Sequence, residues 1–348
     1  MQKIFDGHND LLLRLWRNDD MEAGRFLNGC TGGHIDLPRT RKGGLAGGFF
    51  AIYVPNEEIS GGFDDAGIGR LDIPYLPPVD GLTARRTAQE MAGILLRLER
   101  NHPEALQICR RAADIQTASD SGAIAAIMHI EGAECIGPDL LELELFYAAG
   151  LRSIGPVWSR PNAFGYGVPF RHPGDPNNGP GLTGLGRDLV EACNRMNILV
   201  DLSHLNEAGF WDVARISDKP LVATHSNVHA LSPSARNLTD RQLAAIAETG
   251  GLVGLNYAVN FLREDGLRDP DMPLELMLRH LDHLIGILGE GGVALGSDFD
   301  GATIPAAITD CAGLPNLVQA MRDHGWGDEL TERVCWRNWT DVLERTVG

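Results

Sequence analysis

The sequence predicts a single α/β domain with the (β/α)8 barrel fold, also called a TIM barrel. Short apolar runs alternate with amphipathic helical segments along the chain, and this alternation is typical of parallel βαβ units. The 348 residues are enough for one large barrel with insertions. No stretch rich in Pro, Ser or charge divides them, so we expect residues 1–348 to form one domain.

Eight short apolar runs are expected to form the barrel strands, because each is followed by a segment with helical character. These runs are Lys3–Asp6, Gly48–Val54, Ile124–Ile130, Leu151–Val157, Ile198–Leu202, Leu221–Thr224, Leu252–Asn256 and Val293–Gly296.

Helices are expected between these runs, at Thr83–Asn101, Asp139–Ala149, Gly184–Met196, Asn206–Ser217, Asp240–Thr249 and Leu274–Leu288. A final helix over Asp328–Val347 is expected to pack outside the barrel. The tryptophans near it leave two alternatives open, packing on the barrel or a contact between two copies in a homodimer. They are Trp326, Trp336 and Trp339.

Two Gly- and Pro-rich stretches, Gly61–Asp80 and Ser159–Pro180, follow expected strands and are predicted to be long loops over the barrel mouth. The stretch Gly181–Gly186 precedes a helix. It lacks the Lys-Ser/Thr ending of a phosphate loop, so we interpret it as a helix entry.

The formal net charge of −17 opposes binding to nucleic acid or to an anionic membrane surface. No apolar run approaches the roughly 20 residues of a membrane span, and no secretory signal opens the sequence. The cysteines are far apart without a CxxC pair, so we expect thiols in a reducing cytoplasm. They are Cys30, Cys109, Cys135, Cys193, Cys311 and Cys335.

Six potential metal ligands follow or end five of the expected strands. In a barrel of this type the carboxyl ends of the strands share one rim, so these side chains should meet there. Three imidazoles and three carboxylates suit one or two zinc-like ions, and a central carboxylate can bridge two ions. The six are His8, Asp10, Glu131, His204, His225 and Asp298.

Other histidines are interpreted as structural or peripheral. His34 forms a second His-x-Asp pattern with Asp36, but no strand leads into it. His129 shares the inward parity of Glu131 and is expected to be buried and hydrogen-bonded. His172 and His229 are expected in loops at the surface or rim.

Seven stretches together resemble the renal (membrane) dipeptidase family within the wider amidohydrolase-like metal barrels. They run from position 6 to position 301: Asp6–Asp10, Gly33–Pro38, Ile130–Gly132, Asp201–His204, Thr224–Ser226, Arg236–Asp240 and Gly296–Gly301. The resemblance implies a dipeptidase with two zinc ions and a small dipeptide as substrate, with tolerance of a D residue on its C-terminal side. It also implies that the His34 pattern is not a ligand pair.

The resemblance further implies a role for each site residue. His8 and Asp10 would hold one zinc, His204 and His225 the other, and Glu131 would bridge them. Asp298 would carry protons beside the bridging water. Arg236 would grip the C-terminal carboxylate of the dipeptide, and Tyr53 would lie near the substrate.

One departure from the family concerns the strand Leu151–Val157. Trp158 occupies the place of a histidine that polarises the substrate carbonyl in mammalian-type members. A Trp N–H donates a hydrogen bond but takes up no proton. The polarising role then passes to the metal, to Trp158, or to the nearby Asn162 or Arg160.

Two other functions remain open from the sequence. One is a different metal hydrolase on the same barrel, acting on a lactone, cyclic amide or nucleobase. The other is a non-catalytic metal-binding barrel. No Gly-x-Ser-x-Gly elbow is present, so covalent catalysis is unsupported.

Overall fold

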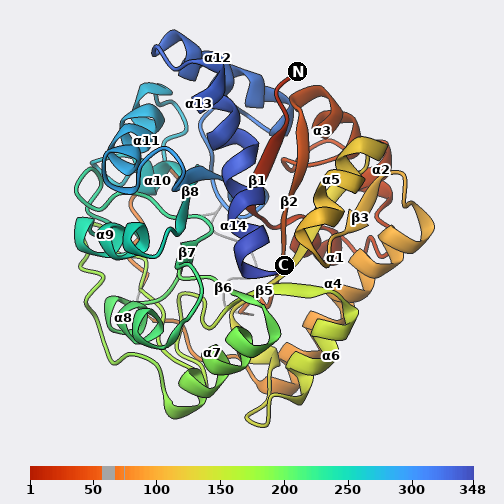
Figure 1. Cartoon of the computed structure of the whole chain (residues 1–348), viewed down its shortest axis with the longest axis vertical. Helices are drawn as coiled ribbons and strands as arrows, with labels where there is room; N and C mark the ends of the chain where they lie inside the picture. The colour runs from red at the N-terminus through yellow and green to blue at the C-terminus, as the bar shows by residue number, and fades with distance from the viewer. Residues whose placement is uncertain (57–66, 74) are drawn as a thin grey trace.

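The computed structural model describes residues 1–56, 67–73 and 75–348, and its centre is a barrel of parallel strands surrounded by helices (Figure 1). The strands pair in the order β6-β5-β4-β2-β1-β9-β8-β7, and every pairing is parallel. A bridge between Asp201 and Val222 joins the two ends of this order and closes the barrel. The predicted (β/α)8 barrel is therefore confirmed.

All eight predicted strands are present, six of them with shifted ends, and the short outer strand β3 is additional. The strands are β1 (Ile4–Asn9), β2 (Leu45–Tyr53), β3 (Leu106–Ile108), β4 (Ile124–Glu131), β5 (Leu151–Gly155), β6 (Leu199–Val200), β7 (Val222–Ala223), β8 (Leu252–Asn256) and β9 (Val293–Gly296). β3 pairs only with β4. The prediction ended β1 at Asp6, but the strand continues through His8 because pairing with β2 extends to Asn9.

The helices include every predicted segment and several that the sequence analysis did not identify. They are α1 (Leu11–Arg17), α2 (Gly24–Asn28), α3 (Leu37–Gly43), α4 (Gly81–Asn101), α5 (Ala112–Ser121), α6 (Leu141–Ala149), α7 (Gly184–Met196), α8 (Glu207–Ile216), α9 (Asp240–Glu248), α10 (Val259–Leu262), α11 (Glu275–Leu288), α12 (Leu314–Asp323), α13 (Asp328–Glu332) and α14 (Asn338–Thr346). None in the described part of the chain combines the length and apolar character that a membrane span requires.

Local signals explain where the helices begin. The Thr183 hydroxyl accepts a hydrogen bond from the Gly186 N–H at the start of α7, which confirms Gly181–Gly186 as a helix entry. Thr239 and Gln242 form a reciprocal capping box at the start of α9.

The C-terminal segment closes one end of the barrel instead of packing outside it, which corrects the prediction for Asp328–Val347. Its helix is broken into α13, a π-helical turn over Arg333–Arg337, and α14. Trp339 is fully buried, contacts Phe5 and Phe49, and donates its indole N–H to the Leu295 carbonyl. Figure 1 shows α14 crossing in front of the strands at this end.

The opposite end of the barrel carries the long loops. In Ser159–Pro180 the structure contains no helix, as predicted, and Phe170 lines a cavity there. Part of the predicted loop Gly61–Asp80 lies outside the described residues. Leu71, which is described, lines the same cavity.

Candidate metal centre

Glu131 lies at the centre of a buried cluster of imidazoles at the carboxyl end of the barrel. Its Oε1 atom is 2.9 Å from Nε2 of His204, 3.4 Å from Nε2 of His225 and 3.6 Å from Nε2 of His8. Four separate strands bring these side chains to one oxygen atom. Such a carboxylate is placed to bridge two cations.

The cluster divides into two sets of ligands that share Glu131. One set contains His8 and Asp10, whose Nε2 and Oδ2 atoms are 3.4 Å apart. The other contains His204 and His225, whose Nε2 atoms are 3.3 Å apart. The structure thus brings together all five residues predicted as metal ligands.

Hydrogen bonds behind the cluster orient two of the imidazoles. The Thr224 hydroxyl donates its proton to Oδ2 of Asp201 at 2.6 Å, so it accepts from Nδ1–H of His225 at 2.8 Å. The Nε2 lone pair of His225 therefore faces Glu131. Ser159 contacts Nδ1 of His204 at 2.8 Å and holds that ring in the matching orientation. This outer support is what a metal-binding histidine requires.

The protonation behaviour of the cluster fits a cation. Burial lowers the pKa of His204 and of His225 well below the usual range, which leaves neutral imidazoles with free lone pairs. Burial raises the pKa of Glu131 to about 8. Burial lowers the pKa of His8, but the electrostatic attraction of Glu131 and Asp10 for an imidazolium outweighs burial and raises the pKa to about 10. The carboxylates of the cluster therefore favour a positive charge beside them.

Two further observations around Asp10 also indicate a site for a cation. Oδ1 of Asp10 is buried and has no hydrogen-bond partner among the described residues. Gly301 lies so close that a Cβ atom there would collide with Oδ2 of Asp10 and would lie 2.5 Å from Oδ1 of Asp298. The chain therefore keeps this space free for carboxylate oxygens and whatever they bind.

Asp298 stands beside the cluster and is held by an amide. Nδ2 of Asn256 donates a hydrogen bond to its Oδ2 atom at 3.0 Å. Asp298 adopts φ 59°, an uncommon conformation for a residue with a side chain. Desolvation raises its pKa, which His8 opposes and Asp10 reinforces. Asn256 holds Oδ2, and Oδ1 is the Asp298 oxygen that lies beside Gly301.

Arg236 is buried behind the cluster with part of its guanidinium unused. It donates to the Ser226 hydroxyl at 3.0 Å and to the His225 carbonyl at 3.1 Å. Its Nε atom has no partner among the described residues. Burial lowers the pKa of Arg236 to about 10, so the group remains cationic at neutral pH.

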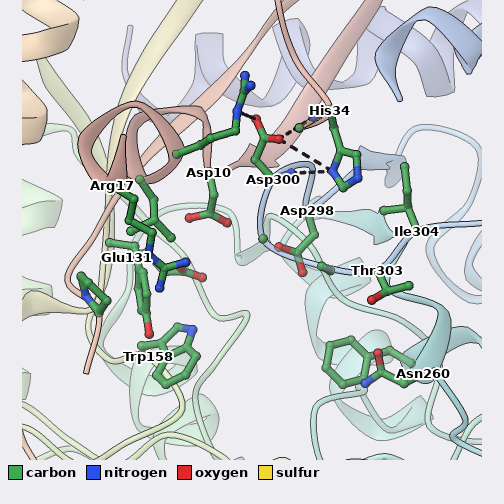
Figure 2. Close-up of a pocket in the computed structure, with 18 of the residues that line it drawn as sticks. Asp10, Arg17, His34, Glu131, Trp158, Asn260, Asp298, Asp300, Thr303 and Ile304 are labelled. Atoms are coloured by element: carbon green, nitrogen blue, oxygen red, sulfur yellow. Dashed lines mark hydrogen bonds and ion pairs between the residues drawn. The ribbon is translucent and has the colours of Figure 1, made fainter. Parts of the chain in front are cut away.

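A cavity of ≈ 490 Å³ opens over the cluster. Asp10, Glu131, Trp158 and Asp298 line it, and Figure 2 shows them facing one space. Tyr53 also lines the cavity, with its ring centroid 5.0 Å from that of Trp158. These positions suit contact with a ligand above Glu131.

Asn162 and Arg160 are placed otherwise than predicted. Asn162 donates to the Pro156 carbonyl and accepts from the backbone N–H groups of Phe164 and Gly165, so its amide holds its own loop. It does not line the cavity. Arg160 is fully buried in an ion pair with Glu134 at 2.7 Å. Neither side chain is available to polarise a substrate.

Three of the other histidines have structural partners, whereas neither ring nitrogen of His172 has a hydrogen-bond partner among the described residues. Nδ1 of His34 accepts from the Asp300 N–H at 2.8 Å, and Asp36 caps α3, so this His-x-Asp pattern holds a loop. His34 nevertheless lines the cavity, which was not expected. His129 is buried and hydrogen-bonded to Ser153 at 2.9 Å, as predicted. The loop residue His229 contacts the Gly174 carbonyl.

The sequence analysis missed the supporting residues Asp201 and Asn256. Asp201 accepts hydrogen bonds from both Ser203 and Thr224, next to the two histidines. The signal was an acidic side chain inside an apolar strand run, because a buried carboxylate must have partners. Asn256 offered only the weaker signal of a polar residue at a strand end.

Comparisons with known proteins agree with this geometry. Residues 1–347 match the model of the family described as Membrane dipeptidase (Peptidase family M19). A crystal structure of a metallo peptidase from Rhodobacter sphaeroides, liganded with a phosphinate mimic of the dipeptide L-Ala-D-Ala, is 54% identical. It superimposes with a TM-score of 0.96, covering 99% of each chain.

Two other relatives were found. The crystal structure of dipeptidase AC, a metallo peptidase of family M19, is also 54% identical, with a TM-score of 0.96 over 100% of this chain and 99% of that chain. An uncharacterized protein in the pqqA 5′ region of Klebsiella pneumoniae is 48% identical over 74% of this chain and 94% of its own length.

Proposed function

This chain belongs to the membrane dipeptidase family, peptidase family M19, and on that premise we propose that it hydrolyses L-Xaa-D-Xaa dipeptides with two zinc ions. The observation that carries the proposal is the position of Glu131, which shares one oxygen among three imidazoles beneath an open cavity. The phosphinate dipeptide mimic bound by the Rhodobacter sphaeroides relative supports the substrate class.

We assign one zinc to His8 and Asp10, the other to His204 and His225, and the bridging position to Glu131. Divalent ions held there would lower the pKa of a bound water molecule from about 15.7 toward about 7 and would polarise a carbonyl group. His204 and His225 need no proton loss to bind, because burial already keeps both imidazoles neutral.

Asp298 is assigned the proton transfer. It accepts the proton that leaves the attacking water and passes it to the amine of the leaving residue. Asn256 fixes Oδ2 of Asp298, so Oδ1 is the oxygen that exchanges the proton. The φ of 59° at Asp298 is a sparsely populated backbone conformation of the kind that is found at functional sites.

Arg236 is assigned the C-terminal carboxylate of the substrate. The guanidinium is buried and cationic, and its free Nε–H is the group that an anion would satisfy. A C-terminal carboxylate held by Arg236 would restrict the enzyme to short peptides. Tyr53 and Trp158 line the cavity, and we assign both to contact with the bound dipeptide.

The experiment is activity of the zinc-loaded protein on a panel of L-Xaa-L-Xaa and L-Xaa-D-Xaa dipeptides, with metal counted on the same sample. Turnover with about two zinc ions per chain is expected, with the D series cleaved at least as fast as the L series. Two bound ions without cleavage of any dipeptide would overturn the substrate and redirect the search to lactones or cyclic amides. A single ion would overturn the assignment to two ligand sets.

A further inference from the structure

The cavity has a cationic wall formed by helix α1, on which Arg14 and Arg17 lie three residues apart and share a face. Both arginines line the cavity, although α1 supplies no residue to the proposed metal centre. Arg14 and Arg17 differ in their contacts with the rest of the protein, and the difference indicates a role for Arg17 in binding a ligand.

Arg14 is fully engaged with the protein. Its Nε atom donates to Oδ2 of Asp300 at 2.9 Å, and its other nitrogens contact the Ile35 carbonyl and the Cys30 sulfur. These contacts tie the end of β9 to the loop around His34. Arg14 therefore neutralises Asp300 and offers no free charge to a ligand.

Arg17 is exposed, and its side chain takes part in no hydrogen bond or ion pair with another described residue. Among the described residues it is thus an unpaired cation on the wall of a cavity, in a chain whose net charge is −17. Figure 2 shows its side chain directed into the space on the side of Glu131 and Trp158.

The position of Arg17 decides which part of a dipeptide it would meet. Arg236, assigned to the C-terminal carboxylate, lies against Phe261, with 5.9 Å between guanidinium and ring centre. Asn260, the neighbour of Phe261, lies across the cavity from Arg17 in Figure 2. A dipeptide whose carboxylate is held on the Phe261 side therefore extends its N-terminal residue toward α1.

We propose that Arg17 forms a subsite for an acidic side chain on the N-terminal residue of the substrate, so that dipeptides beginning with Glu or Asp are preferred. The inference rests on the proposed dipeptidase function and deepens it. An arginine suits this role because its fork of N–H groups matches a carboxylate.

A purely structural role would explain the same residue differently. Arg17 lies in the last turn of α1, where a cation is favoured by the helix dipole. Arg41 is the matched control, since it is exposed in the last turn of α3 and does not line the cavity. Reversing either charge has the same effect on a helix end, but only Arg17 should affect substrate choice.

The test compares kcat/KM for L-Glu-D-Ala and the nearly isosteric L-Gln-D-Ala in the zinc-loaded full-length protein. The variants are Arg17→Glu, Arg17→Lys and Arg41→Glu. We expect the Glu/Gln ratio to fall about fivefold to tenfold in Arg17→Glu, mainly through KM, as for loss of a partly enclosed ion pair. Arg17→Lys should retain most of the ratio, and Arg41→Glu should retain all of it.

The possible results separate this inference from the function on which it rests. An equal Glu/Gln ratio in Arg17→Glu and in the unmodified protein overturns the subsite while dipeptide cleavage stands. A matching fall in Arg41→Glu overturns it too, because the effect would then be one of overall charge. If no dipeptide is cleaved at all, the proposed function itself fails. An Arg17 variant can lose more stability, measured as Tm, than Arg41→Glu does. The Glu/Gln ratio still tests the subsite in that case, because both substrates are measured on the same sample.

Discussion

Two junctions between strands close the same barrel by different means. Between β2 and β4 the backbone register runs without a break from Gly47–Ala125 to Tyr53–Glu131. Between β6 and β7, the described residues form a single backbone bridge, from Asp201 to Val222. We call the first the ladder junction and the second the clamp junction.

Side chains replace the missing backbone pairing at the clamp junction. The Asp201 carboxylate accepts from the backbone N–H and hydroxyl of Thr224 and from those of Ser203. The next residues along the chain are His225 and His204. The ladder junction delivers Glu131 on a rigid strand, whereas the clamp junction delivers its two histidines on residues that hold each other. Site geometry and fold stability are therefore coupled at the clamp junction.

The largest effect is expected from a change at Asp298, which belongs to neither junction. Asp298→Asn removes the proton acceptor but preserves size, so we expect kcat to fall by about 10²- to 10⁴-fold, as for loss of a general acid–base group. Zinc content and the free energy of unfolding should stay nearly unchanged, because both junctions remain intact. Kinetics and metal analysis on the same sample check this.

Loss of zinc together with activity in Asp298→Asn would instead make Asp298 a ligand. Asn256→Leu provides a second variant, since it removes the hydrogen bond that orients Oδ2 without touching the carboxylate. It should lower kcat more than it changes KM.

Metal removal is expected to loosen the clamp junction more than the ladder junction. Bound ions at about 1,000 times their Kd stabilise a fold by about 4 kcal/mol, and a chelator removes that contribution. Backbone amides around His204 and His225 should then exchange hydrogen faster, while those of β4 stay protected. Hydrogen-exchange mass spectrometry with and without chelator measures both regions together. Equal loss of protection in both would show that the two junctions do not differ.

The barrel could be predicted because apolar periodicity is strongest where strands are fully buried. Both faces of β4 are buried along its whole length, and its sequence shows an unbroken apolar run up to His129. The final helix was misplaced because its apolar residues fit either a side or an end of the barrel. Only the burial of Trp339 against β1 and β9 distinguishes these, and that contact is not local in sequence.

The convergence of the five candidate ligands could be predicted because each lies near or just after the carboxyl end of a strand, and strand ends converge. Asn162 was wrongly assigned because a polar residue near a rim looks the same in sequence whether it faces the cavity or caps its own loop. Asp201 was missed as a functional residue because its set of hydrogen bonds with Ser203 and Thr224 is complete only when the ends of β6 and β7 come together in the fold.

Breaking the clamp directly should cost stability and metal affinity together. Asp201→Ala leaves buried N–H and hydroxyl donors of Ser203 and Thr224 without an acceptor, so we expect a loss of about 3 kcal/mol in the free energy of unfolding. Zinc affinity should fall about 10- to 100-fold, as for other residues that orient metal ligands. Denaturant unfolding and competitive chelation give the two values.

Asp201→Asn is the matched variant, because it keeps one acceptor oxygen in the same place. It should show a smaller loss on both scales. An Asp201→Ala protein that unfolds more easily yet binds zinc normally would refute the coupling and reduce the clamp to a packing feature.

The smallest effect is expected from a change at the ladder junction. Ile130 is fully buried in β4 beside Glu131 and alternates with it, so its side chain faces the helices and not the metal centre. Ile130→Val removes one methylene group, and we expect a loss of about 1 kcal/mol in the free energy of unfolding. Zinc affinity should not change, because the continuous register with β2 holds the end of the strand in place. A fall in zinc affinity as large as that of Asp201→Ala would mean that the ladder junction is as tightly coupled to the site as the clamp, and the proposed difference between them would be lost.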